Sequence, residues 1–338
     1  MKTVAGARSG ASAASPQAAL FDAGEAELEL PVCDHYAGVE ARMLKSLALQ
    51  AELGPVFDVT LDCEDGAPVG GEAEHAALVA ETVLSARNVH GRCGVRLHPI
   101  GHPAFEADVA TIVGRAAGRL AYLMLPKVES AADVARAAAA IDAAAAQARI
   151  PLHALIETHA ALAQASAIAA EARIESLSFG LMDFVSAHRG AIPASAMTAE
   201  GQFAHPLVVR AKLEIAAACH AHGKVPSHGV VIEIDDPARV ATAARRAARE
   251  FGYTRMWSIH PSQIRPIVAA FAPDPGALEQ AIAIVAAAQA ADWAPIRHAG
   301  VLHDRASYRH WWRIIVRARR VGAKLPDDVE RRYFGAVP

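Results

Sequence analysis

The sequence predicts an α/β fold in which eight parallel strands close into a barrel. Eight short apolar runs alternate with longer Ala-rich stretches whose apolar faces can pack on a sheet. Such alternation is typical of a parallel sheet, doubly wound or closed, and eight strands favour the closed form. Polar residues follow the runs at their C-terminal ends, where (β/α)₈ TIM barrels build their active sites. The 338 residues, 53% of them hydrophobic, supply enough apolar material for such a core.

The predicted barrel spans residues 29–272. Its strands are expected at 29–33, 57–63, 93–98, 121–126, 152–157, 176–180, 225–232 and 255–260. Residues 1–28 are rich in Ala and Ser and lack the continuous apolar segment of a secretory signal, so we expect a flexible N-terminal arm. Residues 273–338 exceed what a barrel needs and include a basic helix with Trp311 and Trp312, which indicates a helical lid or an oligomer contact.

Bulk properties exclude several classes of function. A net charge of −3 and a pI near 6.6 give no reason to expect nucleic acid or an anionic membrane as partner. No apolar run reaches the roughly 18–20 residues of a membrane span. The four cysteines are far apart in the sequence, which favours reduced thiols in a cytoplasmic protein. The P-loop, GxGxxG, HExxH and GxSxG motifs are missing, which argues against the usual NTPases, dehydrogenases, zincins and serine hydrolases.

Two carboxylates at the ends of neighbouring strands are the candidate metal ligands. Glu157 ends the fifth predicted strand and Asp183 follows the sixth. Two carboxylates, completed by water and a substrate carboxylate, suit octahedral Mg²⁺. Taken singly, each is better explained as a helix cap or an ion-pair partner. Their placement on successive strands favours the metal site.

The other candidate site residues lie at further strand ends. Arg96 ends the third strand and can grip a carboxylate or an enolate oxygen, or pair with the acidic segment after the second strand. In that segment Glu64 and Asp65 are expected to act through Arg96 or metal-bound water, and a surface acidic loop is the alternative. Lys127 and His260 are candidate substrate-binding residues, although His260 has the alternative role of ordering its loop.

Five sequence blocks resemble one family, the citrate lyase β-subunit-like branch of the HpcH/HpaI aldolase superfamily, which includes malyl-CoA and citramalyl-CoA lyases. They are LDCED at 61–65, VRLHP at 95–99, LPKVES at 125–130, LIET at 155–158 with SFGLMDF at 178–184, and SIHPSQI at 258–264. The resemblance implies Glu157 and Asp183 as Mg²⁺ ligands and Arg96 as the carboxylate or enolate partner. It also points to Asp304, in VLHDRA at 301–306, as an acid/base that reaches a neighbouring subunit.

Three segments depart from the family pattern. Ser227-His228-Gly229 stands where relatives have Asp-Gly, and GYTRMW at 252–257 stands where they read GFxGK. At the first strand the family's FVPG-like turn is replaced, which would bring His35 and Tyr36 to the mouth of the barrel. These departures concern CoA and acyl contacts more than the metal pair.

The predicted function is Mg²⁺-dependent retro-aldol or retro-Claisen cleavage of a 3-hydroxyacyl-CoA-type substrate. The expected products are an acyl-CoA and a small 2-oxo acid, and the expected assembly is a homotrimer or homohexamer. The alternatives are a CoA-independent 2-oxo acid aldolase on the same barrel, a ligand-binding paralogue without turnover, and an interaction protein that uses the Trp311–Trp312 helix.

Overall fold

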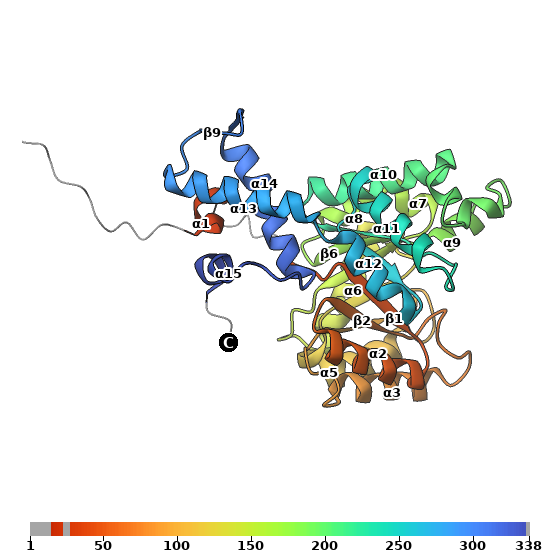
Figure 1. The fold of residues 1–338 in the computed structure, drawn as a ribbon. Helices are drawn as coiled ribbons and strands as arrows, with labels where there is room; N and C mark the ends of the chain where they lie inside the picture. The colour runs from red at the N-terminus through yellow and green to blue at the C-terminus, as the bar shows by residue number, and fades with distance from the viewer. Residues whose placement is uncertain (1–14, 23–27, 336–338) are drawn as a thin grey trace, which may run out of the picture. The chain divides into compact units, whose positions relative to one another are not determined.

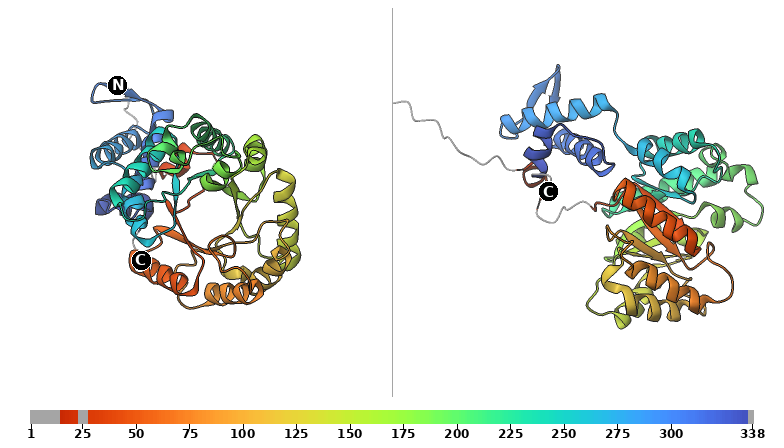
Figure 2. Two further views of the ribbon diagram at one scale, coloured as in Figure 1. Left: turned by 90° about the vertical axis from the view of Figure 1, so that its right-hand side faces the viewer. Right: turned by 60° about the horizontal axis from the view of Figure 1, so that its bottom comes forward.

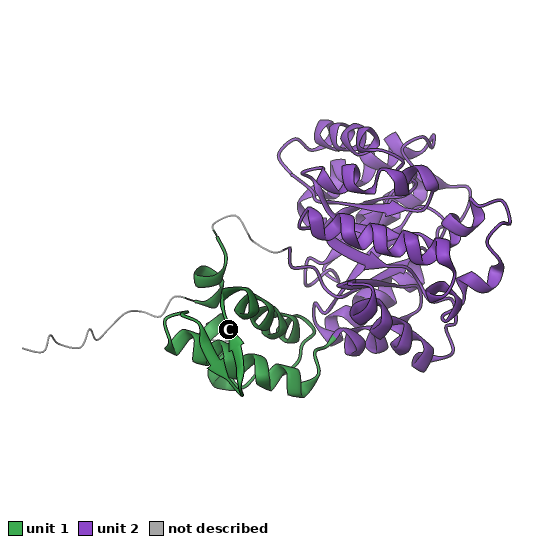
Figure 3. Cartoon of the chain, turned by 90° about the horizontal axis from the view of Figure 1, so that it is seen from above, with its two compact units in different colours: residues 1–27, 272–338 green, residues 28–271 purple. Residues whose placement is uncertain are grey.

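The computed structural model describes residues 15–22 and 28–335, which form two compact units (Figures 1 and 3). One unit comprises residues 28–271. The other comprises residues 272–335 together with residues 15–22. The flexible arm predicted for residues 1–28 lies largely outside the described residues.

The unit of residues 28–271 is a closed barrel of parallel strands, as predicted. The strands follow chain order, and β1 pairs with both β2 and β8 (left-hand view of Figure 2). They are β1 Cys33–Ala37, β2 Phe57–Asp62, β3 Cys93–Arg96, β4 Leu123–Leu125, β5 Leu152–Ile156, β6 Ile174–Phe179, β7 Val225–His228 and β8 Arg255–Ser258.

Helices connect successive strands and cover the outside of the barrel (Figure 1). For example, α6 begins after Ser130, whose hydroxyl accepts a hydrogen bond from the Asp133 amide, and buries Val134, Ala137 and Ile141. The main helices are α2 Glu40–Leu53, α3 Glu72–Leu84, α6 Ala131–Ala144, α10 Pro206–Ala221, α11 Pro237–Glu250 and α12 Pro261–Phe271. Shorter helical pieces are α4 Phe105–Asp108, a π-helical turn at Val109–Val113, α5 Gly114–Ala116, α7 His159–Ala163, α8 Ala165–Ala170, α9 Leu181–Ser186, and 3₁₀ turns at Ala117–Arg119, Ala194–Met197 and Gly201–Phe203.

The first strand was placed too early in the prediction. It begins at Cys33, the last residue of the predicted range 29–33. Asp34 makes this segment look polar, but its carboxylate is buried inside the barrel and accepts hydrogen bonds from Thr60 (2.6 Å) and Tyr122 (3.0 Å). A buried carboxylate with partners of this kind is compatible with a core strand.

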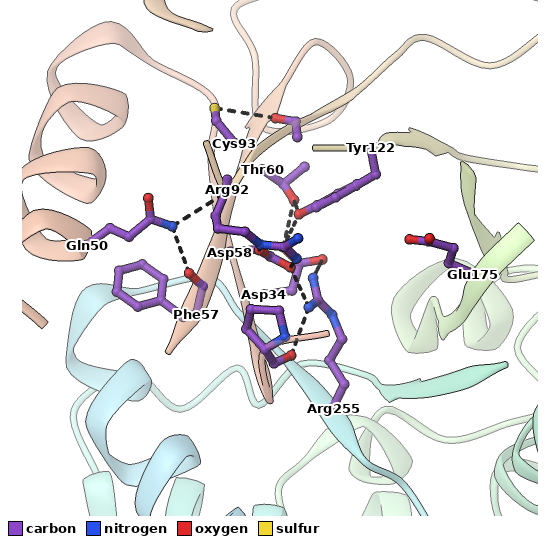
Figure 4. Close-up of polar contacts among 12 residues, drawn as sticks. Asp34, Gln50, Phe57, Asp58, Thr60, Arg92, Cys93, Tyr122, Glu175 and Arg255 are labelled. Carbon is purple, nitrogen blue, oxygen red and sulfur yellow. Dashed lines mark hydrogen bonds and ion pairs between the residues drawn. The ribbon is translucent and has the colours of Figure 1, made fainter. Parts of the chain in front are cut away.

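An ionic network fills the barrel interior near the N-terminal ends of the strands (Figure 4). Arg255 lies 2.6 Å from Asp58 and 3.0 Å from Asp34, and Arg92 contacts Asp58 through two hydrogen bonds of 2.7 and 2.9 Å. Burial alone lowers the pKa of Arg255, but Asp34 and Asp58 raise it well above its ordinary value. Because the two carboxylates share its charge, Arg255 stays protonated inside the barrel.

The second unit is helical with one hairpin. Its elements are α1 Pro16–Leu20, α13 Pro275–Ala290, β9 Ile296–His298, β10 Val301–His303, α14 Arg305–Arg320 and α15 Asp327–Phe334. The Trp312 indole donates a hydrogen bond to Gln17 (2.9 Å), which ties α1 to α14. Trp312 is therefore buried in the core of this unit, whereas Trp311 is only partly covered.

Across the described residues, no helix is both long and apolar enough to span a bilayer. All four cysteines are free and buried: Cys33, Cys63, Cys93 and Cys219.

Candidate active site

An arginine–carboxylate cluster lies where β2 and β3 end. Arg96, the last residue of β3, donates two hydrogen bonds to Asp62, the last residue of β2, at 2.7 and 2.6 Å. Its Nη1 also lies 2.9 Å from Glu64. Burial alone lowers the pKa of Arg96, but Asp62 and Glu64 raise it well above its ordinary value. Both predicted roles remain compatible with this geometry: the acidic segment orients Arg96, and the guanidinium keeps further N–H groups for a ligand.

The loop that carries Glu64 is built on close backbone contacts. The Asp62 carboxylate accepts hydrogen bonds from the amides of Glu64 (2.9 Å) and Gly66 (2.8 Å). A Cβ on Gly66 would lie 2.3 Å from Asp62 Oδ2, and a Cβ on Gly38 would lie 1.8 Å from the Gly66 carbonyl oxygen. Only glycine fits at these two positions, so they determine where Glu64 sits.

Lys127 connects Glu64 with Glu157. Its Nζ donates to Glu64 Oε1 and its backbone N–H donates to Glu157 Oε1, both at 2.5 Å. The backbone of Lys127 is left-handed, with φ of 51°, which turns the amide toward Glu157. Burial lowers and Glu64 raises the pKa of the Lys127 amine, with a net increase. One residue thus holds two carboxylates at the ends of different strands.

Glu157 and Asp183 form a carboxylate pair at the ends of β5 and β6. Glu157 directly follows β5 and is buried, and Asp183 lies in the first turn of α9, partly exposed. Burial, then the charge of Asp183, raises the pKa of Glu157 to about 7. A nearby cation stabilises the ionised form of a carboxylate whose pKa is raised in this way.

The Glu157 side chain occupies the space that a side chain at Gly180 would need. A Cβ at Gly180 would lie 2.5 Å from both Cβ and Oε2 of Glu157. Within residues 15–22 and 28–335, no three His, Cys, Asp or Glu side chains gather closely enough to form a metal cage made of protein alone. Two carboxylates still suit Mg²⁺, which commonly takes one or two protein carboxylates and completes its shell with water and substrate oxygens. The residues present therefore fit this ion.

The remaining candidate residues are Asp65 and His260 in the barrel unit and Asp304 in the other unit. Asp65 is largely exposed at the edge of the cluster, 4.0 Å from Arg96, and burial followed by Glu64 raises its pKa to about 6. His260 is exposed after β8 and its ring contacts Ser262 at 2.7 Å. Asp304 belongs to the other unit, where its carboxylate caps α14 by accepting from the amides of Ala306 and Ser307.

Sequence reasoning was wrong about His35 and silent about Gly180. Successive side chains on a strand face opposite sides, so Tyr36 points into the barrel with Asp34 while His35 points away. The His35 ring lies outside the barrel interior, 2.9 Å from the Ser258 hydroxyl. The signal for Gly180 was available, because it ends the predicted strand 176–180 three residues before Asp183, but its steric role depends on Glu157 at the end of a neighbouring strand.

Comparisons with known proteins decide the family. A sequence model of the family HpcH/HpaI aldolase/citrate lyase matches residues 44–261. This chain belongs to that family. An L-malyl-CoA/β-methylmalyl-CoA lyase from Cereibacter sphaeroides is 30% identical over 247 residues, which cover 69% of this chain and 77% of the relative. The predicted superfamily and the enzyme class, a carbon–carbon lyase, are confirmed.

Solved structures agree with this assignment. A citrate lyase from Burkholderia xenovorans LB400 is 53% identical, with a TM-score of 0.82 over 95% of this chain and 99% of its own. The citrate lyase β subunit from Mycobacterium tuberculosis, complexed with oxaloacetate and magnesium, is 26% identical, with a TM-score of 0.58 over 74% and 99% of the two chains.

Proposed function

We propose that this lyase is Mg²⁺-dependent and acts on a 3-hydroxyacyl-CoA-type thioester, which it cleaves to an acyl-CoA and a small 2-oxo acid or forms from them. The observation that carries the proposal is the buried Glu157 beside Asp183, with a pKa raised to about 7. Support comes from relatives named for malyl-CoA and β-methylmalyl-CoA, and from the citrate lyase β subunit that binds oxaloacetate and magnesium.

In this proposal Glu157 and Asp183 hold the ion. When bound, Mg²⁺ supplies Lewis-acid stabilisation of negative charge on substrate oxygens. Arg96 binds the carboxylate or the developing oxyanion through its unused N–H groups, because its orientation is already set by Asp62 and Glu64. Lys127 positions Glu157 through its amide and balances the charge of Glu64.

The bond changes in the cleavage direction follow from this arrangement. The C2–C3 bond of the 3-hydroxyacyl thioester breaks and its electron pair stays on C2, giving a thioester enolate. The 3-hydroxyl loses its proton and becomes the carbonyl of the 2-oxo acid. The enolate then takes up a proton at C2. We assign the proton transfer to Asp304 of a neighbouring copy. Asp65 acts through Arg96, and Lys127 and His260 contact the substrate.

The first experiment compares thioesters with free acids. Purified chain with Mg²⁺ is incubated with malyl-CoA, citramalyl-CoA, malate and citramalate, and released glyoxylate or pyruvate is quantified. Release from the thioesters alone is expected. Equal release from the free acids would favour the CoA-independent aldolase, and oxo acid binding without any cleavage would favour the ligand-binding paralogue. Glu157→Gln and Asp183→Asn should lower kcat/KM by at least about 100-fold, while Glu81→Gln, at an exposed carboxylate, should leave it unchanged.

A second experiment tests Asp304 across subunits. Asp304→Asn keeps a good helix cap, because Asn and Asp are similarly effective there, so a loss of activity would not reflect a frayed α14. Asp304→Asn and Glu157→Gln are each expected to be inactive. Mixed oligomers of the two should recover activity if one copy supplies Asp304 and the other supplies Glu157. No recovery in mixtures whose subunit exchange is demonstrated would contradict the assignment, and light scattering tests the expected trimer or hexamer.

A further inference from the structure

Asp304 lies in the short connection between the β9–β10 hairpin and α14 (Figure 1). The hairpin turns at Ala299 and Gly300, whose φ angles of 48° and 82° are both left-handed, as a tight two-residue turn requires. Strand pairing continues to His303, which pairs with Ile296 and directly precedes Asp304. The chain therefore arrives at Asp304 in a direction that the hairpin sets.

Two side chains from the first turn of α14 hold the peptide group that joins His303 to Asp304. At one end, the hydroxyl of Tyr308 donates to the carbonyl oxygen of His303 (3.1 Å) as well as to that of Ala294 (2.7 Å). At the other end, the Asp304 N–H donates to the Ser307 hydroxyl (3.0 Å). Because one peptide plane is bound at both ends and α14 begins at the next residue, the direction in which the Asp304 side chain leaves the backbone is fixed.

The carboxylate of Asp304 is held through one of its two oxygens. Oδ1 accepts hydrogen bonds from the amides of Ala306 (3.1 Å) and Ser307 (3.2 Å). No donor in residues 15–22 and 28–335 is hydrogen-bonded to Oδ2, and Asp304 is exposed. The second oxygen therefore remains available to a substrate while the first fixes the plane of the group.

The contact made by Tyr308 goes beyond what helix capping needs. A capping box accounts for the hydrogen bonds that Asp304 and Ser307 exchange. The bond from Tyr308 to the His303 carbonyl is not part of that motif. Tyr308 is also a rigid support, because it is completely buried in the core of its unit, with its ring centroid 6.3 Å from that of Trp293 at an interplanar angle of 65°.

We infer that Tyr308 is a positioning residue for the acid/base Asp304. Its hydroxyl ties the peptide group in front of Asp304 to the core of the unit, and Ser307 holds the other end of the same group. The inference rests on the proposed function, in which Asp304 serves the site of a neighbouring copy. Its consequence is that removing one buried hydroxyl, which touches no substrate, slows the proton transfer.

Tyr308→Phe removes the hydroxyl and keeps the ring. We expect kcat to fall by about 10- to 100-fold, because the carboxylate is no longer held in place. KM should stay within about twofold, because Arg96, Glu157 and Asp183 bind the substrate and the metal and belong to the other unit. Tyr333→Phe is the matched control. The Tyr333 hydroxyl, in the same unit, has no hydrogen-bond partner among the described residues, so its removal should leave kcat unchanged.

A conservative pair at Ser307 gives a second test that keeps the ring of Tyr308. Ser307→Ala loses the acceptor for the Asp304 N–H and should lower kcat in the same way. Ser307→Thr keeps a hydroxyl at this position and should restore kcat to within about threefold of wild type. Circular dichroism at the assay temperature establishes that each variant is folded.

Mixed oligomers separate positioning from a general loss of structure. In a mixture of Glu157→Gln and Asp304→Asn chains, the first chain supplies Asp304 and the second supplies Glu157. Adding Tyr308→Phe to the chain that supplies Asp304 should lower the recovered activity by the factor seen in the single variant. Adding it to the Asp304→Asn chain should change nothing, because that chain's acid/base is unused.

The outcomes distinguish this inference from the proposed function. An equal loss with Tyr308→Phe in either chain, or a wild-type kcat for Tyr308→Phe, refutes the positioning role while the assignment of Asp304 stands. If Glu157→Gln and Asp304→Asn chains recover no activity although their exchange is demonstrated, the assignment of Asp304 is refuted and the positioning role with it.

Discussion

Replacing Gly180 with alanine should displace Glu157 together with the backbone that carries its Cβ. Gly180 has φ of −84°, which any residue can adopt, so the substitution adds a steric conflict and no backbone strain. The new Cβ would lie 2.5 Å from Cβ and Oε2 of Glu157, well inside van der Waals contact. Glu157 must therefore withdraw by about 1 Å, and a misplacement of this size costs on the order of 100-fold in rate.

The expected result for Gly180→Ala is a fall of about 100-fold in kcat/KM and of about 10- to 100-fold in Mg²⁺ affinity. Crowding of this kind should also lower the free energy of unfolding by about 1–3 kcal/mol. Steady-state kinetics, Mg²⁺ titration and urea denaturation measure the three quantities. Activity within threefold of wild type and unchanged Mg²⁺ affinity would refute the view that Gly180 positions a metal ligand.

Gly114→Ala is the matched control. Gly114 has φ of −57° at the start of α5, and a Cβ there meets no heavy atom within 4 Å. The substitution should raise the free energy of unfolding by about 0.5–1 kcal/mol, because alanine loses less conformational entropy in a helix, and should leave kcat/KM unchanged.

Three further predictions concern buried charges. Arg255→Met should lower the free energy of unfolding by about 3–5 kcal/mol in urea denaturation, because Asp34 and Asp58 lose the guanidinium they share; a loss below about 1 kcal/mol would contradict this. Burial lowers the pKa of Lys212 well below its ordinary value, so the free energy of unfolding of the wild type should rise with pH toward the unfolded pKa of about 10.4. Lys212→Met should be more stable than the wild type at pH 7 and should lack this rise. Parallel pH profiles of the unfolding free energy for the two proteins would contradict this prediction. Since the pKa of Glu157 without metal is about 7, apparent Mg²⁺ affinity should fall about tenfold per pH unit below pH 7 and level off above it, and calorimetry that shows a flat profile from pH 5.5 to 8 would rule this out.

Strand assignment shows where sequence reasoning succeeds and where it fails. Six of the eight predicted ranges contain the observed strands, and the range 176–180 overlaps β6, which begins two residues earlier at Ile174. These ranges were predicted correctly because apolar runs between Ala-rich helices are a local feature of the sequence. The first failed because Asp34 made a core strand look polar. Arg255 neutralises the buried charge of Asp34, but it lies more than 200 residues away in the chain. No local sequence pattern predicts this pairing.

The candidate site divides in a similar way. Its residues were found because barrel enzymes place polar side chains at strand ends, so Glu157, Asp183 and Arg96 stand out in the sequence. The acidic partners of Arg96 were also predicted, but the residues that position Glu157 were not. The amide of Lys127 reaches Glu157 through a left-handed backbone turn, and Gly180 matters only because a carboxylate on the adjacent strand occupies the space of its missing side chain.

The sequence by itself determined the barrel, the family blocks and the strand-end residues, because each depends on periodicity or on residues near one another in the chain. Only the tertiary structure decided the raised pKa of Glu157, the burial of Trp312 and the packing of Tyr36 on Trp257. These depend on distances between side chains on different strands or helices. Such distances are set when the barrel closes in one register, and both steric contact and electrostatic interaction change steeply over a few ångströms.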